Sequence, residues 1–368
     1  MKVLYIVGAR PNFMKIAPIM AEMGSFPDIF EQRLVHTGQH YDDEMSRVFF
    51  EELEIPRPDV HLGVGSGSHA KQTARVMLAF EPVLLQEEPE LVLVVGDVNS
   101  TLACTLVAKK LGVAVAHVEA GLRSFDHTMP EEINRLLTDQ MASLLFTTEK
   151  SANDNLIREG ISEDKIHFVG NVMIDTLLRH KERASGLDVL SRYGLKPQGF
   201  GLLTLHRPSN VDKREVLAGL LDALAEVQRA VPVVFPAHPR TIKQVREFGF
   251  EAKLANMSNL IVTEPLGYLT FLNLMANARL VLTDSGGIQE ETTILGVPCL
   301  TLRENTERPV TITQGTNIVV GSNPQRIIDE CSAILRSGNK RGNIPELWDG
   351  KAARRIVDIL SKIVVEGR

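Results

Sequence analysis

The stretch LVLTDSGGIQEE (residues 280–291) passes from a short apolar run into paired glycines and then into a polar segment. This order is typical of a β-strand that turns directly into an α-helix. Paired glycines at such a turn let backbone N–H groups approach a phosphate, and a helix N-terminus adds roughly half a unit of positive charge. We therefore expect Ser285, Gly286 and Gly287 to bind phosphate, and Glu291 to reach a ribose or sugar hydroxyl. A tight turn without a ligand is the alternative interpretation.

The same pattern recurs along most of the chain. Short apolar runs, expected to be strands, lie at 3–7, 91–95, 113–118, 144–147, 202–205, 231–235, 260–262, 280–283 and 298–302. Helix-length segments lie between them, among them 69–87, 99–111 and 131–143. Continuous apolar strands are typical of a parallel sheet that is buried on both faces. Their alternation with helices predicts a doubly wound α/β fold.

The length of 368 residues is comfortable for two domains. The polar segment 181–198 carries glycines and a proline, and we interpret it as a connection. We therefore expect two Rossmann-like, doubly wound parallel-sheet domains that face a cleft, at residues 1–175 and 176–350. An amphipathic helix is expected in the last segment, 351–368.

Composition excludes several classes of protein. The net charge of −6 argues against a nucleic-acid partner, and the absence of an apolar run of about 18 residues argues against a membrane span. The three cysteines Cys104, Cys299 and Cys331 form neither a disulfide framework nor a metal-binding spacing. The N-terminus lacks the features of a signal peptide, so we expect a cytoplasmic protein. No GxGxxG, Walker or HExxH pattern occurs, which disfavours dinucleotide, ATP and zinc chemistry.

Charged residues cluster where strands of the first domain are expected to end. Open parallel sheets bind ligands at the carboxyl ends of their strands. Arg10 and Lys15 follow the first strand, Asp97 and Glu119 close two further strands, and Glu131 begins the next helix. Several carboxylates opposite two cations indicate general acid/base chemistry. A structural ion-pair network is the alternative for any one of these acids.

The second domain offers His206 and His238, each of which follows an expected strand and precedes an arginine by one or two positions. Such groups can donate hydrogen bonds to phosphate oxygens. Arg308, in a loop after strand 298–302, adds a further cation at the ligand edge. Phe271 is expected either to stack on a base or to pack in the core. His40 is a weaker candidate in the first domain.

Taken together, these motifs resemble the non-hydrolysing UDP-N-acetylglucosamine 2-epimerases. The matching elements, in chain order, are GARPNFMK (8–15), GQH (38–40), VVGD (94–97), HVEAGLR (117–123), PEEINR (130–135), GN and ID within 170–175, HR (206–207), DSGGIQEE (284–291) and TERP (306–309). The resemblance implies a fold of the glycosyltransferase-B type, a homodimer, and a terminal helix that packs back on the first domain.

The resemblance also implies the ligand and the site. A UDP-sugar would be the substrate, with no cofactor and no metal. Ser285, Gly286 and Gly287 would bind the diphosphate together with Arg10 and His206. Glu291 would hold the ribose. Uracil would lie at Phe271 and at the backbone near Leu266. The residues around the sugar and pyrophosphate would be Lys15, Asp97, Glu119, Glu131 and Arg308, with Asp97, Glu119, Glu131 and His206 taking the catalytic roles.

The implied reaction interconverts UDP-N-acetylglucosamine and UDP-N-acetylmannosamine by elimination of UDP to a glycal and re-addition. Two alternatives remain within the family: epimerisation of a related UDP-diacetamido-uronic acid, and hydrolytic release of free N-acetylmannosamine. A glycosyltransferase and a nucleotide-sugar sensor are more distant alternatives. The carboxylates disfavour the sensor, because binding a diphosphate requires no acids nearby.

Overall fold

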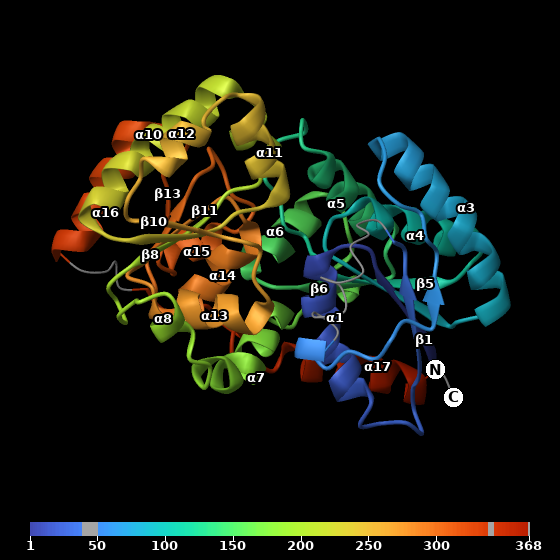
Figure 1. Cartoon of the computed structure of the whole chain (residues 1–368). Helices are drawn as coiled ribbons and strands as arrows, with labels where there is room; N and C mark the ends of the chain where they lie inside the picture. Colours follow the sequence, from blue (N-terminus) through green and yellow to red (C-terminus); the bar gives the residue numbers. More distant parts are fainter. Residues whose placement is uncertain (39–50, 338–341, 367–368) are drawn as a thin grey trace. The chain divides into compact units, whose positions relative to one another are not determined.

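The computed structural model describes residues 1–38, 51–337 and 342–366. The chain forms two compact units, which are described separately (Figure 1). The first unit contains Met1–Arg179 together with Glu346–Arg368, and the second contains His180–Pro345. In the described residues, no helix is long and apolar enough to cross a membrane.

The first unit is built on a parallel sheet with the strand order β3-β2-β1-β4-β5-β6-β7. Its strands are β1 (Lys2–Val7), β2 (Glu31–His36), β3 (Val60–His61), β4 (Leu91–Val95), β5 (Ala114–Ala120), β6 (Leu144–Thr147) and β7 (Ile166–Phe168). All five residues of the central strand β4, LVLVV, are buried, as expected of a strand covered on both faces. Strands β2 and β3 lie on one side of β1, and β4 to β7 lie on the other side. The strand order therefore reverses between β1 and β4, and a ligand crevice is expected at this point.

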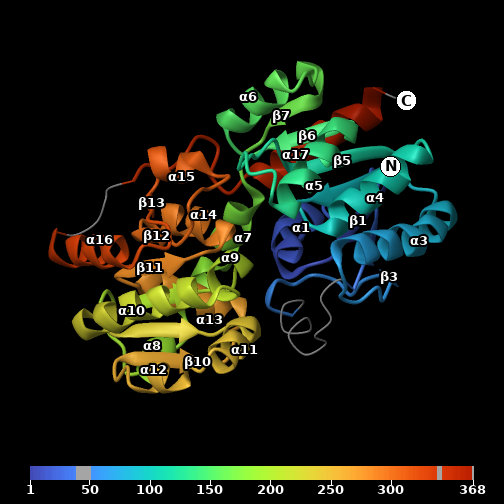
Figure 2. The same cartoon turned by 90° about the horizontal axis from the view of Figure 1, so that it is seen from above.

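Helices cover this sheet. They are α1 (Arg10–Met23), α3 (His69–Glu87), α4 (Asn99–Lys110), α5 (Pro130–Met141), α6 (Lys150–Arg158), α7 (Val172–Ser185) and α17 (Ala352–Glu366). Helices α3, α4 and α5 lie side by side, as both views show (Figures 1 and 2). Helix α17 packs against α1. The carboxylate of Asp175 accepts hydrogen bonds from the backbone N–H groups of Ala352 and Ala353, so α7 holds the N-terminus of α17.

The second unit repeats the plan with the strand order β10-β9-β8-β11-β12-β13, again with parallel pairing. Its strands are β8 (Gly201–Thr204), β9 (Val233–Pro236), β10 (Leu260–Thr263), β11 (Leu280–Thr283), β12 (Cys299–Thr301) and β13 (Asn317–Val319). Its helices are α8 (Val189–Arg192), α9 (Pro208–Val211), α10 (Arg214–Ala230), α11 (Pro239–Glu247), α12 (Glu251–Ala255), α13 (Tyr268–Asn277), α14 (Gly286–Leu295), α15 (Pro309–Thr313) and α16 (Pro324–Ser337). The reversal of strand order falls between β8 and β11, which places the crevice of this sheet beside the stretch 284–291.

The predicted fold class, two doubly wound parallel-sheet α/β domains, is confirmed. The connection predicted over 181–198 is wrong in its first part, because α7 stays helical to Ser185 and α8 adds a short helix. Residues 181–184 are KERA, all good helix formers, and their polarity reflects exposure rather than a loop. Strands β2, β3, β7 and β13 were not predicted, since they are short or half polar and lie toward the edges of the sheets.

Candidate active site

Lys15 and Glu119 form a buried ion pair at the carboxyl edge of the first sheet. Lys15 comes from the first turns of α1, directly after β1. Glu119 lies at an irregularity of β5, where the register with β6 shifts between Val118 and Ala120, and its φ of +73° is in the left-handed region. A non-glycine residue in that conformation costs free energy and is typical of functional sites. The irregularity therefore presents the Glu119 carboxylate to Lys15.

Asp97 follows β4 beside this pair. The intervening Gly96 has a φ of +67°, and a Cβ at that position would lie 2.9 Å from Lys15 Nζ and 3.4 Å from Glu119 Oε2. The backbone of Gly96 thus approaches the ion pair as closely as a residue without a side chain allows. The Asp97 carboxylate is partly exposed and pairs with Arg135 of α5. Lys15, Glu119 and Asp97 are therefore brought together at the crevice of the first sheet.

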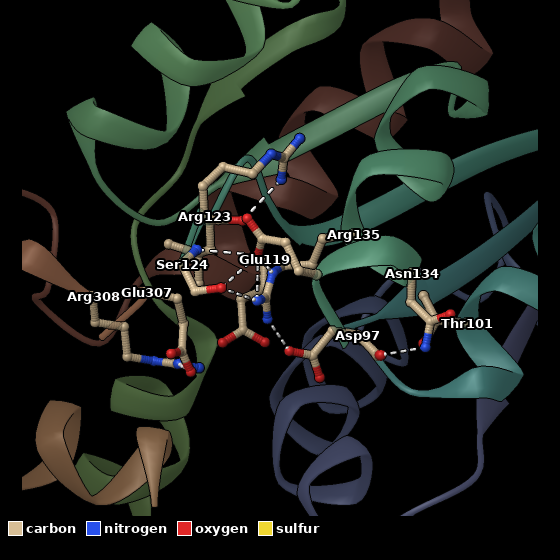
Figure 3. A network of polar contacts seen from close by, with 12 residues as sticks. Asp97, Thr101, Glu119, Arg123, Ser124, Asn134, Arg135, Glu307 and Arg308 are labelled. Carbon is tan, nitrogen blue, oxygen red and sulfur yellow. Dashed lines mark hydrogen bonds and ion pairs between the residues drawn. The ribbon is translucent and has the colours of Figure 1, made fainter. Parts of the chain in front are cut away.

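Helix α5 holds Asp97 through a buried polar network (Figure 3). Glu132 accepts a hydrogen bond from Arg135 Nε at 2.9 Å and from the Ser124 N–H at 3.0 Å. Burial would raise the pKa of Glu132, but the Ser124 N–H and Arg135 outweigh it and hold that pKa below its ordinary value. The side-chain amide of Asn134 donates to the Asp97 carbonyl at 2.9 Å. Both the carboxylate and the backbone of Asp97 are thus fixed by the same helix.

Two other predicted residues of the first unit lie at the N-termini of helices. Glu131 is half-buried in the first turn of α5, one turn before Arg135, and Arg10 is the first residue of α1. His40 lies outside the described residues. Sequence reasoning missed Asn12, whose side chain accepts hydrogen bonds from the Gly8 and Ala9 N–H groups at 3.1 and 2.9 Å and donates to the carbonyl of β4's last residue at 3.0 Å. Asn12 therefore ties the turn after β1 to the end of β4.

The second crevice is built around the N-terminus of α14. Ser285 is the N-cap residue, and its hydroxyl makes no capping hydrogen bond to the helix. A Cβ on Gly286 would lie 2.5 Å from Arg308 Nη1 and 2.8 Å from Glu307 Oε1, so any larger residue would displace these two side chains. Gly287 follows in the first turn. The first N–H groups of a helix have no partner within the helix, and they attract anions together with the helix dipole.

His206 is held at this crevice by a residue that the sequence did not single out, Asp284. The buried Asp284 carboxylate lies 2.8 Å from His206 Nδ1 and accepts the N–H groups of His206 and Arg207 at 2.9 and 2.8 Å. Burial would raise the pKa of Asp284, but the hydrogen bond and charge of His206 and the two backbone bonds hold it below its ordinary value. With Nδ1 beside Asp284, Nε2 is the other ring nitrogen of this half-exposed imidazole.

Arg308 belongs to a buried cluster of alternating charges. Its Nε lies 2.6 Å from Glu290, its Nη1 pairs with Glu307, and Arg303 contacts Glu307 at 2.8 Å. Burial would raise the pKa of Glu307, but the charges of Arg308, Arg303 and Arg207 hold it well below its ordinary value. The cluster fixes Arg308 in place beside Gly286, and the neighbouring carboxylates neutralise much of its charge.

Glu291 is also fixed from outside its own helix. The hydroxyl of Tyr268, the first residue of α13, donates to Glu291 Oε1 at 2.9 Å, and both side chains are buried. Burial and the Glu291 carboxylate raise the pKa of Tyr268 well above its ordinary value, so the phenol stays a donor. Phe271 is half-buried on α13, and Leu266 is half-buried in the segment that leads to that helix. Both lie beyond the carboxyl end of β10.

The predicted residues thus form two groups, one in each unit. Lys15, Asp97 and Glu119 meet at the β1/β4 crevice, and His206, Ser285, Gly286, Gly287 and Arg308 surround the N-terminus of α14. Among the described residues, no group of three or more histidine, cysteine or acidic side chains is arranged to hold a metal ion.

Comparison with known proteins tests the resemblance noted in the sequence. Residues 26–361 match the family model described as UDP-N-acetylglucosamine 2-epimerase. The chain belongs to the UDP-N-acetylglucosamine 2-epimerase family. It is 44% identical over 364 residues to a UDP-N-acetylglucosamine 2-epimerase of Methanococcus maripaludis, with 98% of each chain covered.

Two further proteins of the family are also similar to this chain. A UDP-2,3-diacetamido-2,3-dideoxy-D-glucuronate 2-epimerase of Pseudomonas aeruginosa is 42% identical and covers 99% of this chain and 100% of its own. The crystal structure of the Methanocaldococcus jannaschii UDP-GlcNAc 2-epimerase in complex with UDP-GlcNAc and UDP is similar with a TM-score of 0.92 at 44% identity, covering 98% of this chain and 100% of that one. The resemblance stated from the motifs is therefore confirmed at the level of the family.

Proposed function

We propose that this protein is a non-hydrolysing epimerase that inverts C2 of the sugar in UDP-N-acetylglucosamine and returns UDP-N-acetylmannosamine. The observation that carries the proposal is the grouping of two carboxylates, Asp97 and Glu119, around the backbone of Gly96 at the crevice of the first sheet. Family membership supports the substrate class, since the relatives named above act on UDP-sugars.

The chemistry explains why carboxylates are needed. C2 of an N-acetylhexosamine has no adjacent carbonyl, so a base cannot simply remove its proton. When the bond from C1 to UDP breaks, the bonding electrons leave with the diphosphate, and the developing oxocarbenium ion acidifies the C2 proton. Loss of this proton gives a glycal, and protonation from the opposite face followed by return of UDP gives the epimer. The site therefore requires a base, an acid and stabilisation of the diphosphate.

Each requirement has residues to meet it. We assign the C2 proton transfers to Asp97, Glu119 and Glu131, and the ion pair with Lys15 holds the Glu119 carboxylate in place. The diphosphate would bind the N-terminus of α14 at Ser285, Gly286 and Gly287. His206 would donate from Nε2 to the leaving phosphate oxygen, with Arg10 adding positive charge and Arg308 lying beside Gly286. Glu291 would accept from the ribose, and Phe271 and the Leu266 backbone would contact uracil.

The decisive experiment is incubation with UDP-N-acetylglucosamine in deuterated water, followed by NMR. The expected products are both UDP-sugars with deuterium at C2. Free N-acetylmannosamine and UDP would show a hydrolysing enzyme instead, and unlabelled substrate alone would refute epimerisation. The variant Asp97→Asn is expected to lose exchange while it still binds UDP, because Asp97 lies outside the unit assigned to the nucleotide. Unchanged turnover would remove Asp97 from the mechanism.

One observation favours a second substrate, UDP-2,3-diacetamido-2,3-dideoxy-D-glucuronate. The Pseudomonas aeruginosa relative that carries this name is 42% identical, nearly as similar as the Methanococcus maripaludis relative. The same C2 chemistry serves both sugars, because neither the acetamido group at C3 nor the carboxylate at C6 takes part in it. A comparison of kcat/KM for the two UDP-sugars in the exchange assay decides between them.

We also propose that two copies of the chain associate. Helices α3 and α5 expose the large apolar side chains of Leu78, Leu85, Ile133 and Leu137, and Leu78 is 74% exposed. Within each helix the two side chains, spaced by seven or four residues, lie on one face, and apolar side chains gathered on one face are typical of interaction surfaces. Light scattering should give the mass of a dimer for the wild type, and Leu78→Asp should shift the mass toward a monomer. A monomeric wild type would refute the proposal.

A further inference from the structure

His117, in the buried strand β5, has hydrogen-bond acceptors at both of its ring nitrogens. Nε2 lies 2.8 Å from the carbonyl oxygen of Gly96, and Nδ1 lies 2.6 Å from Oδ1 of Asp139. The imidazole and the carboxylate are both fully buried. A histidine is more often found with one donor and one acceptor, so this arrangement fixes where the hydrogens must be.

The hydrogens follow from the partners. A carbonyl oxygen only accepts, so Nε2 of His117 carries a hydrogen. Oδ2 of Asp139 already accepts the Gly121 N–H at 3.0 Å and lies 2.7 Å from Arg123 Nη1, as an ionised carboxylate does. Nδ1 therefore donates as well, and the ring is an imidazolium.

Charged groups from three neighbouring segments fit this assignment. Asp139 comes from α5, Arg123 from the segment after β5, and Glu159 from the end of α6. Glu159 pairs with Arg123 at 2.6 Å. The imidazolium and Arg123 thus face two carboxylates, so the buried group carries no net charge. Removal of a single member of such a network is destabilising, because the remaining charge loses its partner.

The network holds both backbone segments that present the candidate carboxylates. His117 fixes the Gly96 carbonyl, and the Gly96 N–H donates to the Val118 carbonyl at 3.1 Å, so the residue before Asp97 is tied to β5 twice. The Asp139 carboxylate forms hydrogen bonds with the ring of His117, two residues before Glu119, and with the N–H of Gly121, two residues after it. It therefore spans the irregular stretch of β5 in which Glu119 adopts its left-handed conformation (φ +73°).

We propose that His117 is a positioning residue, held as a buried imidazolium by Asp139, that sets the relative placement of the Asp97 and Glu119 carboxylates. The part of this inference that concerns catalysis rests on the proposed epimerisation. The part that concerns the charge of the ring does not. Neither His117 nor Asp139 is assigned a contact with the substrate, so their effect is on the rate of the chemical step rather than on nucleotide binding.

The charge is tested on the unmodified protein. With 15N-labelled histidine, long-range proton–nitrogen NMR at pH 7 should show both ring nitrogens of His117 as protonated nitrogens, because each faces an acceptor. Comparison with Asp139→Asn and His117→Gln assigns the signal among the ten histidines. A ring nitrogen without a proton at pH 7 would overturn the proposal, whatever the enzyme's activity.

Positioning is tested with Asp139→Asn, which keeps the shape of the side chain and removes its charge. A displacement of about 1 Å at a reacting group can cost about 100-fold in rate, so we expect kcat for C2 exchange to fall by about that factor. KM and the Kd for UDP should stay unchanged. Backbone amide exchange at Gly96 and Gly121 should become faster, and this readout requires no activity.

The matched control is His167→Gln, on strand β7 of the same sheet, which should leave C2 exchange and both amides unchanged. A loss of UDP affinity in Asp139→Asn equal to its loss of rate would show general damage and would overturn the positioning role. Full activity of Asp139→Asn would also overturn the positioning role. Absence of C2 exchange in the wild type would instead refute the proposed epimerisation, and the NMR and amide results would still decide the charge and the anchoring.

Discussion

Gly286→Ala is the substitution whose effect follows most directly from distances in the second unit. The added Cβ would lie 2.5 Å from Arg308 Nη1, where ordinary contact begins at 3.4 Å, so the guanidinium must retreat by 3.4 − 2.5 = 0.9 Å. A retreat of that size would stretch the 2.6 Å bond between Arg308 Nε and Glu290 toward the limit of a hydrogen bond. Overpacking of this kind costs about 1–3 kcal/mol.

The buried surroundings of Arg308 prevent an easy escape. Glu307 Oε1 would lie 2.8 Å from the same Cβ, and its carboxylate is held by Arg303 as well as by Arg308. We expect the free energy of unfolding in urea, followed by circular dichroism, to fall by about 1–3 kcal/mol. UDP affinity measured by calorimetry should weaken by about tenfold for each 1.4 kcal/mol of lost interaction at the α14 N-terminus.

The control for this prediction is Gly201→Ala at the start of β8 in the same unit. A Cβ there would meet Val233 Cγ2 at 3.6 Å, an ordinary contact, so neither stability nor UDP binding should decrease. If Gly286→Ala were as stable as the wild type and bound UDP equally well, the close approach between α14 and Arg308 would not be required for the fold or the site.

Three further predictions concern single hydrogen-bonded groups. Glu119→Gln leaves its buried lysine partner unpaired, so C2 exchange by NMR should be lost and unfolding should cost about 3–5 kcal/mol less; retained exchange would contradict the role of this acid. Tyr268→Phe removes the 2.9 Å hydrogen bond to Glu291 and should weaken UDP binding, measured by calorimetry, by about 1.5–3 kcal/mol. Binding of 2′,3′-dideoxy-UDP, which lacks the ribose hydroxyls, should weaken much less. Equal losses for the two nucleotides would show that Glu291 does not contact the ribose. Asp284→Asn should lower the free energy of unfolding at pH 7. Since His206 and the backbone depress the Asp284 pKa, this stabilisation is present above the ordinary value of 3.8 and is lost as pH falls through the lower folded value. The gap between wild type and variant in urea titrations should therefore close in acid, and a constant gap would contradict the assignment.

Much of the fold could be predicted because its central strands are continuous apolar runs that can be recognised in the sequence. The runs 91–95, 144–147 and 280–283 became strands with those bounds, since continuous valine and leucine have no exposed face to interrupt them. Edge strands such as β7 (Ile166–Phe168) have three residues and too little pattern to identify. The positions of the acids after strands were visible for the same reason, because a buried strand must end at the sheet edge.

The residues that hold those acids could not be found in this way. Asp284, Asn12 and Asp139 each bond a backbone group far away in the chain, at separations of 78, 83 and 18 positions, and no local pattern marks these distant partners. Asp284 directly follows a strand, where an aspartate is as often a turn former. Which acceptor meets which N–H depends on the order of strands in the sheet.

For helix α5 the apolar periodicity of the sequence predicts the helix but not which of its faces is buried. Its spacing predicts a helix over 131–143, and the helix is present as Pro130–Met141. Periodicity groups residues by face, but the buried face here is the polar one: Glu132, Arg135 and Asp139 are at most 2% exposed, whereas Ile133 and Leu137 are each 46% exposed. Those charges can be buried because β4, β5 and the residues that follow them supply the Asp97 carboxylate, the Gly121 N–H and the His117 ring as partners. An inverted amphipathic helix beside strand-end carboxylates is therefore itself an indication of a site, since a structural helix would place its apolar face against the sheet.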